Sequence, residues 1–187
     1  MKNRKALLII DMQKGSFTPL TPRYDTSGVV KRINLVADAF RSRSLPVFYI
    51  QHDGTACGEF VPHTAEWELL DELAVEPGDI FVDKYANNVF YNSNLQAKMI
   101  QHSVNELMIS GCATDFCVES TIQAALTMDY NITVIEDGHT TGERPNLTAL
   151  QVIEHYNWVW RNMLPTKGVL SVKPHNDILK ELSNVNS

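Results

Sequence analysis

The sequence predicts an α/β fold, a three-layer sandwich in which a six-stranded parallel sheet is covered by helices on both faces. Short apolar runs alternate along the chain with segments whose apolar residues recur at helical spacing, which is the pattern of repeated strand–helix units. The apolar runs are continuous, as is typical of strands buried on both faces. The chain has 187 residues, 44% of them hydrophobic, so we expect one domain over residues 1–187.

The first strand and the first helix follow directly from this pattern. Residues 6–10 form an uninterrupted run of Ala, Leu and Ile that ends at Asp11. The segment after Asp11 contains Pro and Gly and is expected to be a loop. Apolar residues then recur at helical spacing over residues 28–43, which predicts a helix there.

The second and third strands are expected over residues 46–50 and 80–82. Residues 51–66 between them read as a long loop, a kind of segment that is often functional. Residues 67–70 form at most one helical turn. Helical spacing over residues 92–102 predicts the helix that follows the third strand.

The fourth strand is expected over residues 106–111, and the helical pattern after it covers residues 115–128. The fifth strand is expected over residues 132–135. It should end before the sequence Glu-Asp-Gly, so residues 139–145 are expected to form a loop.

Asn146 is expected to cap a long helix over residues 146–163. Apolar residues lie on more than one side of this helix, so we expect it to contact another subunit as well as the sheet. A sixth strand over residues 169–172 and a helix over residues 175–184 complete the predicted fold.

The predicted topology locates the site before any motif is considered. In parallel α/β sheets the ligand lies beyond the carboxyl ends of the strands, where the strand order reverses. Asp11, Lys84 and Cys117 follow the first, third and fourth strands. Each has a structural explanation too, as a strand-ending carboxylate, a solvated lysine or a small core residue.

Together these three residues have the chemistry of acyl transfer. A helix N-terminus and a nearby lysine are expected to favour the thiolate of Cys117. Asp11 can accept the thiol proton and later return it to a leaving amine. Backbone N–H groups at the turn can bind the oxyanion.

Composition excludes several other classes of protein. The net charge is -6 and Lys and Arg form no run, which argues against a nucleic-acid surface or an anionic membrane partner. The apolar run after the basic N-terminus is too short for a signal peptide or a membrane span, so a cytoplasmic location is expected. The three cysteines fit free thiols better than a disulfide framework, and their spacing argues against structural zinc.

Several short motifs give the chain a resemblance to a known family. They are Leu7-Leu8-Ile9-Ile10-Asp11-Met12-Gln13, Gln51-His52, Trp67-Glu68-Leu69, Gly78-Asp79, Lys84 with Asn87-Asn88-Val89-Phe90, and Gly111-Cys112-Ala113-Thr114-Asp115-Phe116-Cys117-Val118. With them, residues 5–175 resemble the isochorismatase-like cysteine hydrolase superfamily. That superfamily includes nicotinamidases, N-carbamoylsarcosine amidases and isochorismatases.

The resemblance implies a catalytic triad of Asp11, Lys84 and Cys117, and cleavage of a small-molecule amide or carbamoyl C–N bond through a thioester. It also implies a cis peptide just before Ala113, and an oxyanion hole formed by the N–H groups of Ala113 and Cys117. A homodimer or homotetramer is implied as well. Isochorismatase-type vinyl ether hydrolysis is the alternative, but it needs no thiol.

The sequence departs from nicotinamidases at the place of their metal site. The Asp-x-His order is absent, because His52 and Asp53 are adjacent and His63 is the one other nearby histidine. We therefore expect no metal and no cofactor, with His52 and His63 as loop or pocket-wall residues.

A small, partly planar substrate is expected from the side chains predicted to line the pocket. These are Phe17, Gln51, Trp67, Phe90, Tyr91 and His139. Arg144 is either a carboxylate contact or a solvated loop charge. Two further classes stay open: a redox pair of Cys112 and Cys117, for which the five-residue separation is awkward, and a non-catalytic binding protein.

Overall fold

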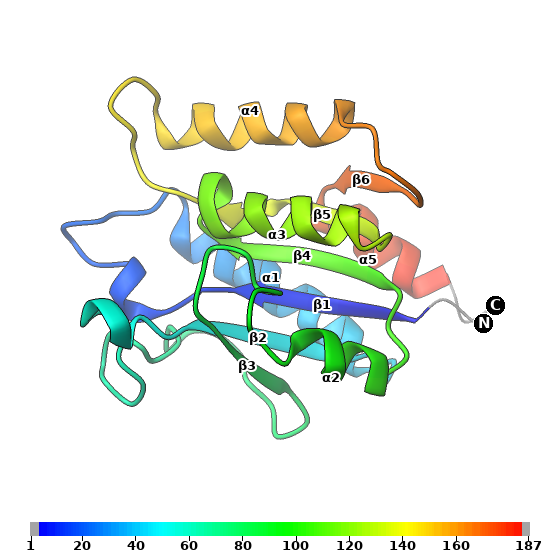
Figure 1. Ribbon diagram of the computed structural model, residues 1–187. Coiled ribbons are helices and arrows are strands. Elements are labelled where there is room, and N and C mark those ends of the chain that lie inside the picture. The colour runs from blue at the N-terminus through cyan, green and yellow to red at the C-terminus, as the bar shows by residue number, and fades with distance from the viewer. Residues whose placement is uncertain (1–3, 185–187) are drawn as a thin grey trace.

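The computed structural model describes residues 4–184, and its strands and helices alternate along the chain (Figure 1). The strands are β1 (Lys5–Ile10), β2 (Val47–His52), β3 (Ile80–Lys84), β4 (Glu106–Cys112), β5 (Asn131–Thr140) and β6 (Leu170–Lys173). The α-helices are α1 (Thr26–Arg41), α2 (Leu95–Gln101), α3 (Glu119–Thr127), α4 (Ala149–Asn162) and α5 (His175–Asn184). The predicted fold class is confirmed.

The strands form one sheet in the order β3-β2-β1-β4-β5-β6, and every neighbouring pair is parallel. The chain runs outward from β1 to β3, then returns to the other side of β1 with β4. Strand order therefore reverses between β1 and β4, where Ile10 pairs with Gly111. This is the position at which such sheets bind ligands.

Helices cover both faces of the sheet and create two hydrophobic cores (Figure 1). Because side chains alternate along a strand, Leu8 and Ile10 of β1 face α2, α3 and α4, and Leu7 and Ile9 face α1 and α5. Trp160 of α4 is fully buried in the first core. The two cores hold the carboxyl ends of β1 and β4 in place.

Strand β5 is longer than the sequence predicts. It continues to Thr140 because Glu136, Asp137 and Gly138 form an irregularity rather than a turn, and pairing with β4 resumes at His139. Other segments satisfy the polar groups of this irregularity: Asn157 donates to the carbonyl of Glu136 (3.0 Å) and Arg32 to that of Asp137. The strand thereby places His139 next to Gly111, near the carboxyl end of β4.

Helix α4 begins three residues after the predicted position. Thr148, not Asn146, is its N-cap, because the Thr148 hydroxyl accepts from the Gln151 backbone N–H (3.2 Å) and the Gln151 side chain accepts from the Thr148 N–H (2.9 Å). This capping box satisfies two N–H groups that a helix start leaves unpaired. Among residues 4–184, neither α4 nor any other helix is long and apolar enough to cross a membrane.

Candidate active site

Asp11, Lys84 and Cys117 meet at the carboxyl edge of the sheet. The Lys84 ammonium lies 2.7 Å from Asp11 Oδ2 and 3.3 Å from the sulfur of Cys117. The third N–H group of the Lys84 ammonium donates to the carbonyl oxygen of Ala86 at 2.9 Å. All three N–H donors of the ammonium are thus used, so Lys84 is fixed between the carboxylate and the thiol.

Burial sets the charges of these groups. Burial lowers the pKa of Lys84, but Asp11 and Cys117 outweigh that effect, and the net change raises it. Burial and the Asp11 carboxylate raise the pKa of the Cys117 thiol well above its usual range, although Lys84 opposes the rise. Lys84 favours the thiolate, as the sequence predicts, but the effect of desolvation is larger, so the folded site favours the protonated thiol.

The turn that carries Cys117 is built around Gly111. Gly111 has a φ of 119°, and a Cβ there would lie 2.1 Å from the carbonyl oxygen of Ile10. The peptide between Cys112 and Ala113 is cis, as the resemblance implies. A π-helical segment, Thr114–Val118, then leads into α3. The N–H groups of Phe116 and Val118 both donate to the Ala113 carbonyl at 3.1 Å, which packs Cys117 against the turn.

Two cavities open at Cys117. One of about 260 Å³ is lined by Asp11, Ser16, Arg23, Asn87, Cys112, Ala113, Phe116, Cys117 and Arg144. The other, about 120 Å³, is lined by Asp11, Gln13, Ser16, His52, Phe60, Lys84, Asn87 and Cys117. Asp11 and Cys117 line both cavities, so a small molecule in either cavity lies beside the carboxylate and the thiol.

The smaller cavity contains polar atoms whose hydrogen bonds are incomplete. Among the residues that the structure describes, Asp11 Oδ1 and His52 Nδ1 are buried and have no hydrogen-bond partner. Burial and the charge of Lys84 lower the pKa of His52, so its imidazole is neutral at pH 7. The walls of the cavity therefore include a carboxylate and a neutral imidazole.

A buried chain of hydrogen bonds supports the residue that follows Ala113. Thr114 Oγ1 lies 2.9 Å from His139 Nδ1, and His139 Nε2 lies 3.1 Å from Asn157 Oδ1. Because the Asn157 amide nitrogen donates to the Glu136 carbonyl, its Oδ1 accepts from His139 Nε2–H. His139 Nδ1 then accepts from the Thr114 hydroxyl, so the chain of donors runs in one direction.

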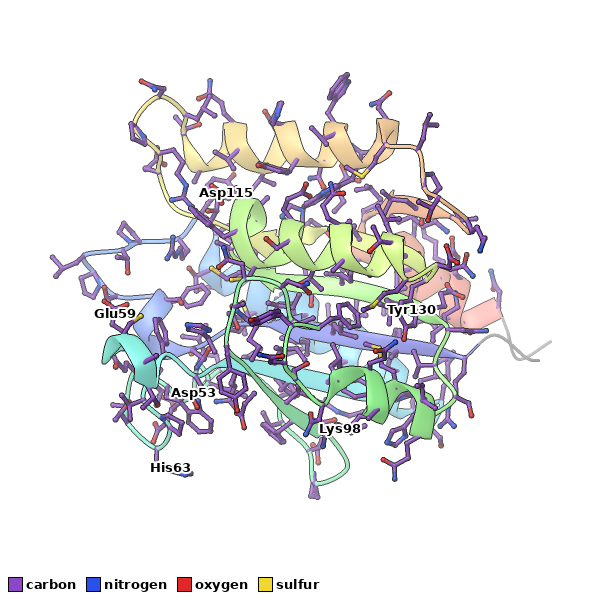
Figure 2. The ribbon with its side chains drawn as sticks, viewed as in Figure 1. Asp53, Glu59, His63, Lys98, Asp115 and Tyr130 are labelled. Carbon is purple, nitrogen blue, oxygen red and sulfur yellow. The ribbon has the colours of Figure 1, made fainter. Side chains whose placement is uncertain are left out.

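A second anchor holds the other side of the same turn. Asp115, at the start of the helical segment in Figure 2, accepts from Arg144 at 2.6 and 2.9 Å and from the Thr141 hydroxyl at 2.7 Å. The Arg144 guanidinium also lies over the Phe116 ring, 5.1 Å from its centroid. Arg144 is thus a wall of the cavity and not the solvated charge that the sequence also allowed.

The six side chains predicted to line the pocket lie outside both cavities. Gln51 is buried and donates to the Trp67 carbonyl (3.0 Å), and Phe17 lines a separate surface cavity. Phe90 stacks on Tyr130, and Tyr91 is exposed. His139 is fully buried against Trp160 and acts through Thr114. Gln51 and His139 lie in β2 and β5 and not in the loops where the sequence placed them, and the sequence did not determine which way any of the six side chains points.

The residues that do form the walls come mostly from loops. Asn87 belongs to the motif that follows Lys84, and its Oδ1 lies 3.7 Å from the Cys117 sulfur. The motif could therefore have identified Asn87 as a residue of the cavity wall. Phe116 belongs to the motif around Cys117. Ser16, Arg23 and Phe60 carried no comparable pattern, because their positions depend on how loops fold over the sheet edge.

The region of the nicotinamidase metal site is arranged differently here. Asp53 Oδ1 accepts from the backbone N–H and hydroxyl of Thr55, and His63 packs on the Trp67 ring. Figure 2 shows Asp53 and His63 on the loops that follow β2. Within residues 4–184, no three His, Cys, Asp or Glu side chains are grouped so as to hold a metal ion.

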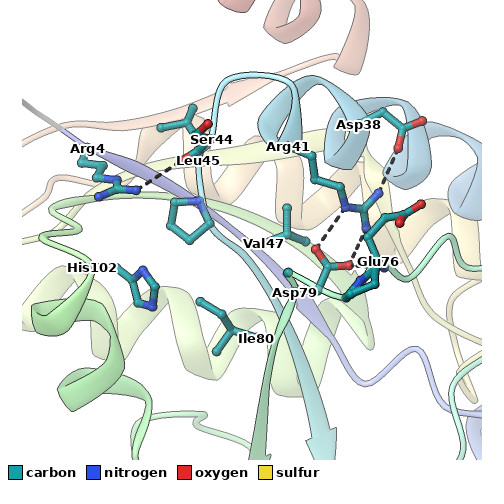
Figure 3. Close-up of a pocket in the computed structure, with 13 residues that line it drawn as sticks. Arg4, Asp38, Arg41, Ser44, Leu45, Val47, Glu76, Asp79, Ile80 and His102 are labelled. Atoms are coloured by element: carbon teal, nitrogen blue, oxygen red, sulfur yellow. Dashed lines mark hydrogen bonds and ion pairs between the residues drawn. The ribbon is translucent and has the colours of Figure 1, made fainter.

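A larger cavity lies at the opposite end of the sheet. It measures about 630 Å³ and is lined by residues that precede or begin β2 and β3, including Val47 and Ile80 (Figure 3). Its Arg41 guanidinium is paired with Asp79 at 2.7 Å and with Asp38 at 2.9 Å. None of Asp11, Lys84 and Cys117 lines it, so the reactive groups belong to the smaller cavities.

Comparison with known proteins gives similarity over most of the chain. The model of the isochorismatase domain matches residues 5–159. The ureidoacrylate amidohydrolase RutB of Caulobacter vibrioides is 30% identical over 175 residues, which cover 73% of this chain and 77% of the relative. The crystal structure of an isochorismatase family protein gives a TM-score of 0.82 at 30% identity and covers 91% of this chain and 98% of that one. N-carbamoylsarcosine amidase from Thermoplasma acidophilum shares the fold, with a TM-score of 0.72 at 24% identity over 92% of this chain and 97% of that one.

Proposed function

The chain belongs to the isochorismatase family and is a hydrolase acting on non-peptide C–N bonds, and from this premise we propose that it cleaves small amides or carbamoyl compounds through a thioester on Cys117. The observation that carries the proposal is the position of the Lys84 ammonium, 2.7 Å from Asp11 and 3.3 Å from the Cys117 sulfur. A cavity of about 260 Å³ opens on that sulfur.

The first half of the proposed reaction forms the thioester. Asp11 takes the proton of the Cys117 thiol, and the sulfur attacks the substrate carbonyl carbon. The carbonyl oxygen becomes an oxyanion that accepts from the N–H groups of Ala113 and Cys117. When the tetrahedral intermediate collapses, the C–N bond breaks and Asp11 returns its proton to the leaving nitrogen, which departs as ammonia or an amine.

The second half of the reaction releases the acid. Asp11, again a carboxylate, accepts a proton from a water molecule that attacks the thioester carbonyl. The C–S bond then breaks, and the proton returns to the sulfur of Cys117. Lys84 stays protonated throughout and stabilises whichever of Asp11 and Cys117 carries the negative charge.

The relatives support the class of substrate. RutB is named for ureidoacrylate, and the structural neighbour is named for N-carbamoylsarcosine. In the present chain the two cavities at Cys117 measure about 260 and 120 Å³, which suits small molecules. Small amides, carbamoyl compounds and ureides are therefore the compounds to test.

The test is an ammonia-release screen over these compounds with wild type, Cys117→Ala and Cys57→Ala. We expect Cys117→Ala to reduce kcat at least about 10⁴-fold, because the nucleophile is lost. Cys57 is an exposed free cysteine, so Cys57→Ala should match wild type. Full hydrolysis by Cys117→Ala would exclude the thioester mechanism.

A further inference from the structure

The charges around the larger Cys117 cavity do not cancel. Its lining contains three charged side chains, Asp11, Arg23 and Arg144. Asp11 is balanced by Lys84 at 2.7 Å, and Arg144 is balanced by Asp115 at 2.6 Å. The charge left over is that of Arg23, in a chain whose net charge is -6.

Arg144 has little capacity left for a ligand. Its Nε and Nη2 donate to Asp115, Nη2 also donates to the Thr141 hydroxyl at 2.6 Å, and Nη1 donates to the Glu143 carbonyl at 3.1 Å. Four of its five N–H groups are used. Arg144 therefore forms part of the cavity wall but has too few free N–H groups to bind a carboxylate through two hydrogen bonds.

Arg23 differs from Arg144 in this respect. Its Nε donates to the Ser16 carbonyl at 2.7 Å, which anchors the half-buried side chain. Within residues 4–184, Nη1 and Nη2 of Arg23 have no hydrogen bond or ion pair. Gly142 leaves room for the guanidinium, because a Cβ there would lie 2.9 Å from Nη1.

The positive charge of Arg23 acts on residues at the carboxyl end of the sheet. Burial raises the pKa of Cys112 to about 12, and Arg23 is the charge that opposes this rise most strongly. Cys112 lines the same cavity and precedes the proposed oxyanion donor Ala113. The unpaired positive charge thus faces the place where a substrate would lie.

We propose that Arg23 binds a carboxylate of the substrate, so that the preferred substrates are small amides or ureides that carry a carboxylate. This inference rests on the proposed function. A planar guanidinium with two free nitrogens matches a carboxylate in a two-bond arrangement. Arg23 would position the anion at one end of the cavity while Cys117 attacks the carbonyl at the other.

A second surface cavity provides the competing explanation and a control. Arg23 also lines a cavity of about 650 Å³ beside α1, whose wall includes Lys31. Lys31 does not line either cavity at Cys117. If Arg23 served the surface cavity, Lys31→Gln and Arg23→Gln would have similar effects.

The first experiment needs no substrate. Iodoacetate and iodoacetamide alkylate thiols and differ in that iodoacetate carries a carboxylate. Mass spectrometry gives the rate of each reagent at Cys117, with exposed Cys57 in the same chain as the internal standard. Both reagents react with the same thiolate, so the ratio of their rates does not depend on the pKa of Cys117.

We expect Arg23→Gln to lower the iodoacetate-to-iodoacetamide ratio at Cys117 about tenfold. Arg23→Lys should have a smaller effect because the charge remains, and Lys31→Gln should have none. Circular dichroism checks that each variant compared is folded, and Arg23→Lys is used if Arg23→Gln does not fold. An unchanged ratio in a folded Arg23→Gln protein, or an equal fall in Lys31→Gln, would overturn the proposal.

The second experiment separates this inference from the proposed function. N-carbamoylglycine and N-carbamoylglycinamide present the same ureide with and without a carboxylate. We expect Arg23→Gln to raise KM for the acid about tenfold and to leave KM for the amide unchanged. If ammonia is released from amides but the two KM values change equally, the Arg23 proposal fails and the hydrolase proposal stands. If iodoacetate is selected at Cys117 but no amide in the screen is cleaved, the hydrolase proposal fails.

Discussion

At the scale of single residues, the arrangement of Asp11, Lys84 and Cys117 lowers the free-energy cost of the proton transfer that we propose for this buried site. Before transfer, Asp11 is negative, Lys84 positive and Cys117 neutral; afterwards Asp11 is neutral and Cys117 negative. The sum is zero in both states, so burial does not penalise the step through a change in net charge. The Lys84 ammonium touches both atoms between which the charge moves.

His139 provides a prediction about pH. Burial lowers its pKa to about 4, and its Nδ1 accepts from Thr114. In the unfolded chain the pKa of a histidine is about 6.5. Between these values the unfolded chain binds a proton that the folded protein does not. Stability is therefore full above about pH 6.5 and falls as the pH drops toward 4, by about 3 kcal/mol in all.

Chemical denaturation at a series of pH values between 4.5 and 7.5 measures this effect. We expect the free energy of unfolding of wild type to fall more steeply with acidification than that of His139→Gln, which has no group to protonate. The exposed His155 of α4 gives the control, and His155→Gln should retain the wild-type slope. Equal slopes for wild type and His139→Gln would contradict the argument.

At the scale of secondary structure, the close contact between β1 and β4 depends on one glycine. A Cβ on Gly111 would lie 2.1 Å from the Ile10 carbonyl oxygen, and its φ of 119° disfavours other residues. We expect Gly111→Ala to lower the free energy of unfolding by at least about 3 kcal/mol and to abolish activity, because Asp11 and the Cys117 turn both begin at this contact.

Gly78→Ala is the matched control for that substitution. A Cβ on Gly78 meets no atom within 4 Å, so its effect on stability should stay within about 0.5 kcal/mol. Urea denaturation followed by circular dichroism compares the two variants. A Gly111→Ala protein as stable as Gly78→Ala would mean that β1 and β4 can separate without cost.

The elements differ in how well the sequence predicts them, for physical reasons. Buried strands carry continuous apolar runs, so the sequence places all six strands close to their observed positions. Strand β5 is missed beyond Ile135, because Glu136-Asp137-Gly138 is typical of a turn and only contacts from Arg32 and Asn157 keep it in the strand. The start of α4 depends on a side-chain pair, Thr148 with Gln151, which competes with Asn146 as a cap.

The candidate site likewise has one part that the sequence predicts well and another that it predicts poorly. Strand ends are set by topology, so Asp11, Lys84 and Cys117 can be predicted to meet without knowing any side-chain conformation. The cavity wall is set by loops, where the direction of each side chain depends on tertiary contacts. Arg144 is an example, because its role follows from the Asp115 carboxylate 2.6 Å away and not from its own loop sequence.

At the scale of the whole molecule, helix α4 presents apolar side chains to solvent. It is the outermost helix beyond α3 in Figure 1. Trp158 is 62% exposed, Leu150 is 39% exposed, and Leu147 and Leu164 beside the helix ends are also exposed. Exposed apolar side chains along an outer helix are a feature of interfaces between proteins. The helix follows the loop that carries Arg144, so a partner packed on α4 would also restrain one wall of the cavity.

We propose that α4 lies in the interface of the homodimer or homotetramer expected from the sequence. Light scattering should give a mass that is a multiple of 21.1 kDa. Trp158→Glu should shift the protein to the monomer, because a charge would be buried without a partner. Ile100→Glu is the control, since Ile100 is an exposed apolar residue of α2, at 69%, and should leave the mass unchanged. If Trp158→Glu keeps the wild-type mass at all concentrations, α4 is not the interface, and Trp158 is simply an exposed side chain.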